Sequence, residues 1–96
     1  MTVEEIKTVL SLHKPALAEK FKVREIGVFG SFARGEQDET SDIDVLVEFS
    51  EPVGFFVFLD LEEHLGSILG RKVDLVSRKA LKPRIGQNIL RDLIVV

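Results

Sequence analysis

The segment from Asp42 to Phe49, with the sequence DIDVLVEF, alternates between acidic and apolar residues before its last positions. Side chains two positions apart in a β-strand project from the same face, so the apolar residues Ile43, Val45 and Val47 would share one face. Asp42 and Asp44 would share the opposite face. We therefore predict a strand that one face anchors in a core, while the other face presents two carboxylates at an open edge of the fold.

The 96 residues, 45% of them hydrophobic, are enough for one modest core and predict a single domain over residues 1–96. The chain has no Cys, no signal-peptide pattern and no apolar run near the roughly 20 residues that span a bilayer. We expect a soluble cytoplasmic protein that contacts no membrane. The net charge of -3 argues against direct nucleic-acid binding. Ten acidic residues and no Lys or Arg lie within residues 36–70, whereas residues 71–96 contain seven basic residues.

Turn and capping signals divide the chain into elements. The capping box Thr2-Val-Glu-Glu5 predicts a helix to about Leu12, and Pro15 predicts a break before a short second helix through Lys20. Strands are predicted at Val23–Phe29, Asp42–Phe49 and Lys72–Val76. The turn-rich residues 30–41 separate the first two strands, and Phe32–Arg34 could form one helical turn. Helices are predicted at Gly54–Leu69, ended by Gly70, and at about Ile85–Ile94, with Ser77 capping a turn between them.

This order of elements predicts an α+β fold with a small mixed sheet of three to four strands. The helices are expected to pack mainly on one side of the sheet. No repeat, linker or low-complexity segment interrupts the chain.

The two acids of the second predicted strand have no basic residue within seven positions. Neighbouring carboxylates repel each other unless a cation lies between them, and Mg²⁺ prefers oxygen ligands of this kind. Asp74 of the third predicted strand can join Asp42 and Asp44 if the two strands are neighbours. Three carboxylates can hold two metal ions roughly 3.5 to 4 Å apart. A D-x-D pair alone is weak evidence, because a solvated acidic strand has the same pattern.

Gly30-Ser31 follows the first predicted strand and opens a turn that contains Gly35. Exposed backbone amides and a hydroxyl in such a turn could hold a phosphate group. The turn matches neither the Walker A pattern nor G-x-G-x-x-G. Without the acids that follow, a plain strand-to-helix turn would be the better explanation.

Together, these residues carry a resemblance. Gly30-Ser31, ten intervening residues and Asp42-Ile43-Asp44 resemble the G-S-x10-D-x-D signature of the DNA polymerase beta-like nucleotidyltransferase superfamily. Arg34-Gly35 and Ser41-Asp42 are similar to the family's local pattern, and Lys72-Val-Asp-Leu-Val76 resembles the strand that carries its third acid. The short length and the ending Arg84–Arg91 resemble the minimal nucleotidyltransferase (MNT) subfamily, which is usually partnered with a HEPN-domain protein.

The resemblance implies a nucleotidyltransferase fold and a role for each site residue. Asp42 and Asp44 would hold two Mg²⁺ ions that bind ATP, and Gly30 and Ser31 would contact its terminal phosphates. Asp74 would bind the metal nearer the acceptor and could deprotonate the attacking hydroxyl. Arg34 would take part in nucleotide binding by neutralising charge, and Arg78 or Lys79 after the third predicted strand could add to that neutralisation. For these three basic residues, a solvent-exposed cation without a role is the alternative.

The resemblance further implies that AMP passes from ATP, with release of pyrophosphate, to a tyrosine of a HEPN ribonuclease toxin. The chain would then be an antitoxin and a protein adenylyltransferase. One alternative is a non-catalytic antitoxin that neutralises its partner by binding. The other keeps the catalysis but uses RNA or a small molecule as the acceptor. The short chain and its negative charge weigh against the second alternative.

A run of five apolar residues bears on the partner: Phe55, Phe56, Val57, Phe58 and Leu59. Consecutive residues of a helix cannot all face one apolar stripe about 100° wide. We therefore expect part of this run to remain as a surface for another chain or for an oligomer contact. The alternative is a helix that is sandwiched between the sheet and the terminal helices.

Overall fold

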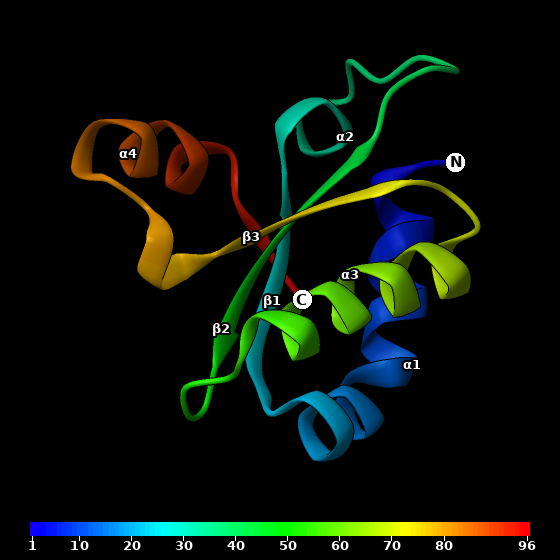
Figure 1. The fold of residues 1–96 in the computed structure, drawn as a ribbon. Helices are drawn as coiled ribbons and strands as arrows, with labels where there is room; N and C mark the ends of the chain where they lie inside the picture. Colours follow the sequence, from blue (N-terminus) through cyan, green and yellow to red (C-terminus); the bar gives the residue numbers. More distant parts are fainter.

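The computed structural model of the chain describes residues 1–96, which form four α-helices, one short 3-10 helix and a four-stranded sheet (Figure 1). The elements are, in order, α1 (Val3–Phe21), β1 (Val23–Phe29), α2 (Gly30–Arg34), β2 (Ile43–Phe49), α3 (Phe55–Leu69), β3 (Val73–Ser77), η1 (Arg78–Ala80), α4 (Pro83–Asp92) and β4 (Ile94–Val95). The three predicted strands are confirmed to within one residue at each end. The predicted helix that precedes Gly70 is confirmed as α3.

The sheet has the strand order β3-β2-β1-β4. β1 is antiparallel to both β2 and β4, whereas β2 and β3 run parallel. The sheet is therefore mixed, which confirms the predicted α+β class. As an inner strand, β2 is hydrogen-bonded on both sides, so two backbone ladders hold the strand that carries Asp44 and begins immediately after Asp42.

The helices α1 and α3 contact each other and cover one face of the sheet (Figure 1). Sixteen buried side chains form the core, mainly from these two helices and the inward faces of β1, β2 and β3. Ile43, Val45 and Val47 are fully buried there, as the alternating pattern predicts. Leu93, which follows α4, lies on the opposite face of the sheet, against Gly27. None of the helices combines the length and the hydrophobicity that crossing a bilayer requires.

The predicted break at Pro15 is wrong, because α1 continues from Val3 to Phe21 with Pro15 inside it. Pro15 cannot donate a backbone hydrogen bond to the carbonyl of Ser11, but both residues are exposed, so water can satisfy that carbonyl. Leu10 and Leu17, on either side of the proline, are fully buried. Their packing against the core holds the two halves in one helix. The predicted capping box between Thr2 and Glu5 is confirmed.

The chain after β3 differs from the prediction in three ways. The last helix begins at Pro83 and ends at Asp92, two residues before the predicted position at each end. Ile94 does not end this helix but begins β4, which pairs with Gly27 and Val28 of β1. The free edge of β1 offers unpaired backbone groups that an extended segment satisfies better than a helix can. Ser77 precedes η1, but its side chain makes no capping hydrogen bond.

Candidate active site

The acids Asp44 and Asp74 lie side by side on neighbouring strands. The parallel pairing of β2 with β3 places their Cα atoms in register. Asp42 stands two positions before Asp44, immediately ahead of β2, and the Ile43 amide donates to the carbonyl oxygen of Lys72 at 2.9 Å. The condition under which the sequence predicts a three-acid group, that the two strands are neighbours, is therefore met.

Asp44 has the most constrained surroundings of the three acids. Burial raises the pKa of its carboxyl group, and the charges of Asp74 and Asp42 raise it further, while Arg34 opposes them. Asp44 is only partly buried, so solvent screens part of this repulsion. The in-register pairing with Asp74 and the position of Asp42 two residues away place both acids close enough to repel the Asp44 carboxylate. A cation between them would relieve that repulsion.

Asp42 is partly exposed and has a basic neighbour. Its Oδ2 is 3.7 Å from Nζ of Lys72, in an ion pair with a largely exposed lysine side chain. The three carboxylates do not converge into a group of three ligands that could hold one metal ion. Mg²⁺ commonly takes only one or two carboxylates and completes its octahedron with water and phosphate oxygens. Acids in this arrangement fit that donor set.

Gly30 connects β1 to α2 directly beside Asp44. Phe29, the last residue of β1, pairs with Asp44 across the antiparallel ladder. The φ angle of Gly30 is +74°, and a Cβ atom at this position would collide with Oδ2 of Asp44. Only glycine permits this approach of the backbone to the carboxylate. Ser31 follows, partly buried, so the predicted Gly30-Ser31 turn and the predicted acids are brought together.

Arg34, at the end of α2, is near the acids but is already paired. Its Nη1 donates to Oδ2 of Asp92 at 2.8 Å and its Nε donates to Oε2 of Glu36 at 3.0 Å. The hydrogen bond to Asp92, followed by the one to Glu36, raises the pKa of Arg34. Arg34 therefore links α2 to α4 in this structure, and its charge acts on Asp44 from a distance.

Arg78 and Lys79 are not brought to the acids. They follow the far end of β3, about 13 Å along the strand from Asp74 at 3.3 Å per residue. Arg78 instead forms an ion pair of 3.5 Å with Glu48. Lys79 lines a cavity of about 310 Å³ together with Phe49, Phe55 and Phe58. The structure thus favours the alternative that these two cations have no direct role at the acids.

Sequence reasoning missed one residue next to the site. Arg71 donates hydrogen bonds to the backbone carbonyls of Ser41 and Asp38, and its guanidinium lies over the ring of Phe32. The available signal was its position as the first basic residue after the acidic block of residues 36–70. Nothing in the sequence shows which carbonyls such a side chain would reach, because the contacts span about 30 residues.

Comparison with known proteins decides the family. Residues 10–96 match the family described as nucleotidyltransferase domain. The chain belongs to this family. This nucleotidyltransferase is 49% identical over 96 residues to the protein adenylyltransferase MntA of Thermococcus cleftensis, covering 100% of the chain and 97% of that protein. A protein of Methanocaldococcus jannaschii, whose name provisionally assigns it the same activity, is 52% identical over 96 residues and is covered to 98%, with 99% of the chain aligned.

Solved structures share the fold of this nucleotidyltransferase. A structure provisionally described as a minimal nucleotidyltransferase has a TM-score of 0.76 and 37% identity to this protein. The match covers 98% of this protein and 95% of the solved chain. A crystal structure described as a toxin-antitoxin with AMP-PNP has a TM-score of 0.72 and 25% identity to this protein. The match covers 99% of this protein and 72% of the solved chain. The predicted nucleotidyltransferase fold is confirmed.

A more distant likeness extends the fold comparison. The structure of a tri-AMPylated Shewanella oneidensis HEPN toxin in complex with an MNT antitoxin has a TM-score of 0.62 and 22% identity, over 97% of the chain and 66% of that chain. This likeness concerns the fold alone.

Proposed function

We propose that this nucleotidyltransferase is a Mg²⁺-dependent protein adenylyltransferase that transfers AMP from ATP to a tyrosine of a HEPN-domain toxin and thereby acts as its antitoxin. The observation that carries the proposal is the in-register pair Asp44 and Asp74, with the Gly30 backbone against Asp44. The names of the adenylyltransferase relatives support AMP as the transferred group. The resemblance to a toxin-antitoxin structure with AMP-PNP supports ATP as the donor.

The acids of the site provide the ligands for the metal. Asp42, Asp44 and Asp74 would hold Mg²⁺, which when bound would neutralise the triphosphate and hold it for in-line displacement. The raised pKa of Asp44, caused by burial and then by Asp74 and Asp42, supports a cation at this position. Gly30 and Ser31 would face the terminal phosphates, since the absence of a side chain at Gly30 lets the backbone lie directly against the metal-binding Asp44.

Asp74 differs from the other two acids in its accessibility. It is exposed and lies on β3, an edge strand of the sheet. An acceptor hydroxyl can therefore approach Asp74 more easily than Asp44, which supports Asp74 as the acid that takes the hydroxyl proton. The tyrosine oxygen would form a bond to the α-phosphorus, the bond from that phosphorus to the bridging oxygen of pyrophosphate would break, and pyrophosphate would leave with the electron pair.

The start of α3 supports a partner protein as the acceptor. Phe55 and Phe56 are 69% and 79% exposed, and Val57 and Leu59 are more than one-third exposed. These residues are not sandwiched between the sheet and the terminal helices. We propose that the Phe55–Leu59 surface contacts the partner or a second copy of the chain, because desolvating adjacent aromatic side chains is a common source of binding energy.

The decisive experiment is intact mass spectrometry of the purified chain and its co-purified HEPN partner after incubation with ATP and Mg²⁺. We expect a partner that is heavier by one or more AMP groups, and peptide mapping should place AMP on tyrosine. An unchanged partner mass, under conditions in which ATP binds, would exclude protein adenylylation. An AMP adduct found only on added RNA or on a small molecule would identify a different acceptor.

The exposed surface on α3 also favours a second function, neutralisation by binding alone. This function predicts that a folded variant with Asp42→Ala and Asp44→Ala still protects cells from the partner. The adenylyltransferase proposal predicts that this variant gives no protection. Replacing Phe55 and Phe56 with Ser should weaken partner binding, whereas Leu12→Ser, at an equally exposed apolar position on α1, should not.

A further inference from the structure

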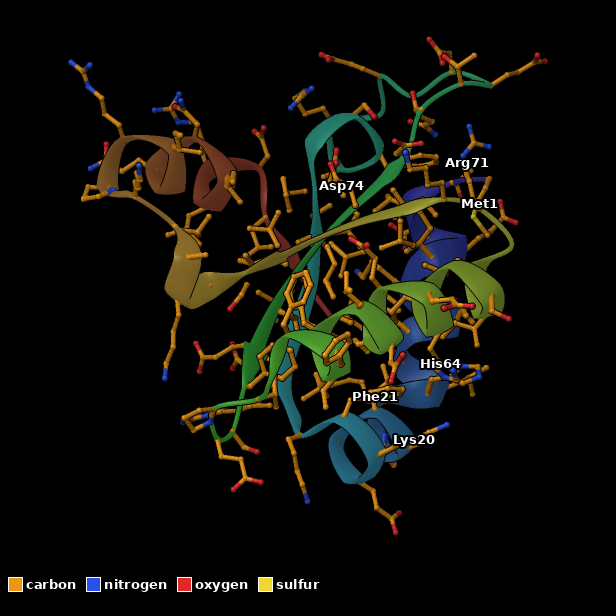
Figure 2. The ribbon with its side chains drawn as sticks, viewed as in Figure 1. Met1, Lys20, Phe21, His64, Arg71 and Asp74 are labelled. Carbon is orange, nitrogen blue, oxygen red and sulfur yellow. The ribbon has the colours of Figure 1, made fainter.

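Arg71 lies in the short turn between α3 and β3, where its side chain crosses to the loop before β2. Figure 2 shows it beside that loop, at the same end of the sheet as Asp74. Its Nε donates to the carbonyl oxygen of Ser41 at 2.7 Å, and its Nη2 donates to the carbonyl oxygen of Asp38 at 2.8 Å. The guanidinium carbon is 5.3 Å from the centre of the Phe32 ring. One side chain therefore contacts two separate parts of the chain, the loop before β2 and the helix α2.

Two of these contacts lie next to the proposed site residues. Ser41 immediately precedes Asp42, and Phe32 immediately follows Ser31. We propose that Arg71 is a positioning residue, which holds Asp42 at a set place relative to the Gly30-Ser31 turn so that both can act on one Mg²⁺-nucleotide complex. This inference rests on the proposed role of Asp42 as a metal ligand.

The loop from Glu36 to Ser41 is held at its start, where the Glu36 amide donates to the carbonyl oxygen of Ser31 at 2.9 Å and Gln37 donates to that of Met1 at 3.2 Å, so the end near Ser41 is the part that needs such a tether. The loop contains no helix or strand and most of it is exposed. Its internal order comes from Asp38, whose Oδ1 accepts hydrogen bonds from the amide and the hydroxyl of Thr40, both at 2.8 Å. These bonds shape the loop but do not attach it to the sheet. Arg71 supplies two bonds between this loop and the segment that begins β3.

The backbone beyond the loop is already fixed on the other side of Asp42. The Ile43 amide donates to the carbonyl oxygen of Lys72, the residue after Arg71. Asp42 thus stands between a backbone that is held by β3 and a loop that is held by Arg71. Loss of the guanidinium would leave Ile43 in place and free the residues before Asp42, so the Asp42 carboxylate would sample more positions.

The geometry requires arginine. A guanidinium is planar, carries five N–H donors and can stack on an aromatic ring while donating to two carbonyls. A lysine ammonium is a compact charge that cannot make both carbonyl contacts and also cover the Phe32 ring. An arginine-to-lysine change should therefore keep the charge and lose the positioning.

The test compares Arg71→Gln and Arg71→Lys with the unchanged chain and uses two readouts. Calorimetry measures Mg²⁺ affinity in the presence of AMP-PNP, and steady-state kinetics of AMP transfer separates kcat from KM. We expect both variants to bind Mg²⁺ at least tenfold more weakly and to lose at least tenfold in kcat, while KM for ATP changes less than threefold. Arg24→Gln is the matched control, since Arg24 is exposed, lies on β1 and pairs only with Glu48.

Chemical rescue distinguishes positioning from general support of the fold. In Arg71→Ala, added guanidinium ion at low millimolar concentration should restore part of the Mg²⁺ affinity and of kcat, and ammonium ion should not. If this variant does not fold, the Gln and Lys variants decide. Unchanged Mg²⁺ affinity in Arg71→Gln would overturn the proposal, and so would losses in that variant that only match a loss of folded protein seen by circular dichroism.

The binding readout separates this inference from the proposed function. If the unchanged chain binds Mg²⁺ with AMP-PNP but modifies no tyrosine, the acceptor assignment fails while the role of Arg71 is still decided by Mg²⁺ affinity. If the unchanged chain binds no Mg²⁺ under these conditions, the roles of Asp42 and Arg71 are both overturned.

Discussion

Gly30 has a φ angle of +74°, and its α-carbon faces the carboxylate of Asp44. Gly35, five residues later, has nearly the same φ angle of +72°, but no atom would lie within 4 Å of a Cβ atom built there. The two glycines share a backbone requirement and differ in their surroundings. Substitutions at these two positions therefore distinguish the free-energy cost of a left-handed backbone from the cost of placing a side chain against Asp44.

Replacing Gly30 with Ala should disrupt the site much more than the same change at Gly35. Gly35→Ala should cost about 1 kcal/mol of unfolding free energy, from the left-handed backbone alone. Gly30→Ala adds the collision with Asp44, and we expect a loss of about 2–4 kcal/mol together with loss of AMP transfer. Urea denaturation and the transfer assay measure both effects. Equal losses in the two variants would show that the approach to Asp44 is unimportant.

Asp44 combines a function with a cost to stability. Because burial and the neighbouring acids raise its pKa, its charge is unfavourable in the folded protein without metal. Asp44→Asn should therefore raise the unfolding free energy at pH 7 in EDTA, by about 1 kcal/mol or less given its partial exposure. The same change should lower the AMP transfer rate by about 10³-fold or more.

Asp60, an exposed acid on α3, provides the control for this substitution. Asp60→Asn should leave both stability and transfer nearly unchanged. If Asp44→Asn instead destabilised the metal-free protein, repulsion among the three acids would not be a significant term in its stability.

The helix α1 is longer than its sequence signals indicate, because tertiary contacts act across Pro15. Leu10 and Leu17 are buried on either side of the proline. Pro15→Ala restores an amide that can donate to the carbonyl oxygen of Ser11. We expect the unfolding free energy to rise by about 1–2 kcal/mol. This is less than the roughly 3 kcal/mol by which Pro is less favourable than Ala inside a helix, because alanine also gives the unfolded chain more conformational freedom. Thermal and urea denaturation measure it. A destabilised variant would mean that the proline ring makes contacts worth more than the missing hydrogen bond.

The contact between α1 and α3 includes a histidine, a side chain whose ordinary pKa lies close to neutral pH. The rings of Phe21 and His64 are 5.3 Å apart, and burial lowers the pKa of His64, with smaller effects from Lys20 and His13. The unfolded chain therefore binds a proton at this residue more readily than the folded chain. The unfolding free energy should fall as the pH drops below about 6.5, the ordinary pKa of histidine. The loss should stop growing once the pH is below the pKa of His64 in the folded protein.

Replacing His64 with Gln should remove this part of the pH dependence. We expect a flatter profile of unfolding free energy between about pH 7 and pH 5, with a difference below about 1 kcal/mol. Urea denaturation at a series of pH values measures the slope. A variant with the same slope as the unchanged chain would show that His64 does not contribute.

One ion pair links the helices α2 and α4. Arg34 of α2 contacts Asp92 of α4 at 2.8 Å, and these helices lie next to each other (Figure 1). The charge of Arg34 also acts on Asp44, where it opposes the burial and the neighbouring acids that raise the pKa of that carboxyl group. Arg34 is thus either a link between helices or a cation for the nucleotide, and two substitutions distinguish these roles.

Arg34→Gln removes both the ion pair and the charge, whereas Asp92→Asn removes only the ion pair. An exposed pair of this kind contributes roughly 0–1 kcal/mol, so both variants should fold. If Arg34 neutralises phosphate, kcat/KM for ATP should fall about tenfold or more in Arg34→Gln and less than threefold in Asp92→Asn. Equal effects in the two variants would show that Arg34 only connects the helices.

Local patterns were sufficient to predict most of the fold. The alternation of Ile43, Val45 and Val47 with the acids identifies β2 and its buried face, since one strand with period two leaves few other ways to bury three apolar residues. The glycine after α3 and the capping box before α1 place two helix ends for equally local reasons. The errors at Pro15 and Ile94 arise where distant packing outweighs a local preference.

The residues available for the chemistry can be read from the chain alone: two acids on one predicted strand face, a third acid in a later strand, and a Gly-Ser turn before them. The folded structure was needed to show that β2 and β3 are neighbours, that Gly30 lies against Asp44, and that Arg71 reaches Ser41. The difference lies in the sequence separation of the residues involved. Periodicity and capping depend on residues a few positions apart, whereas strand pairing, close approach and the reach of a guanidinium depend on where the whole chain packs.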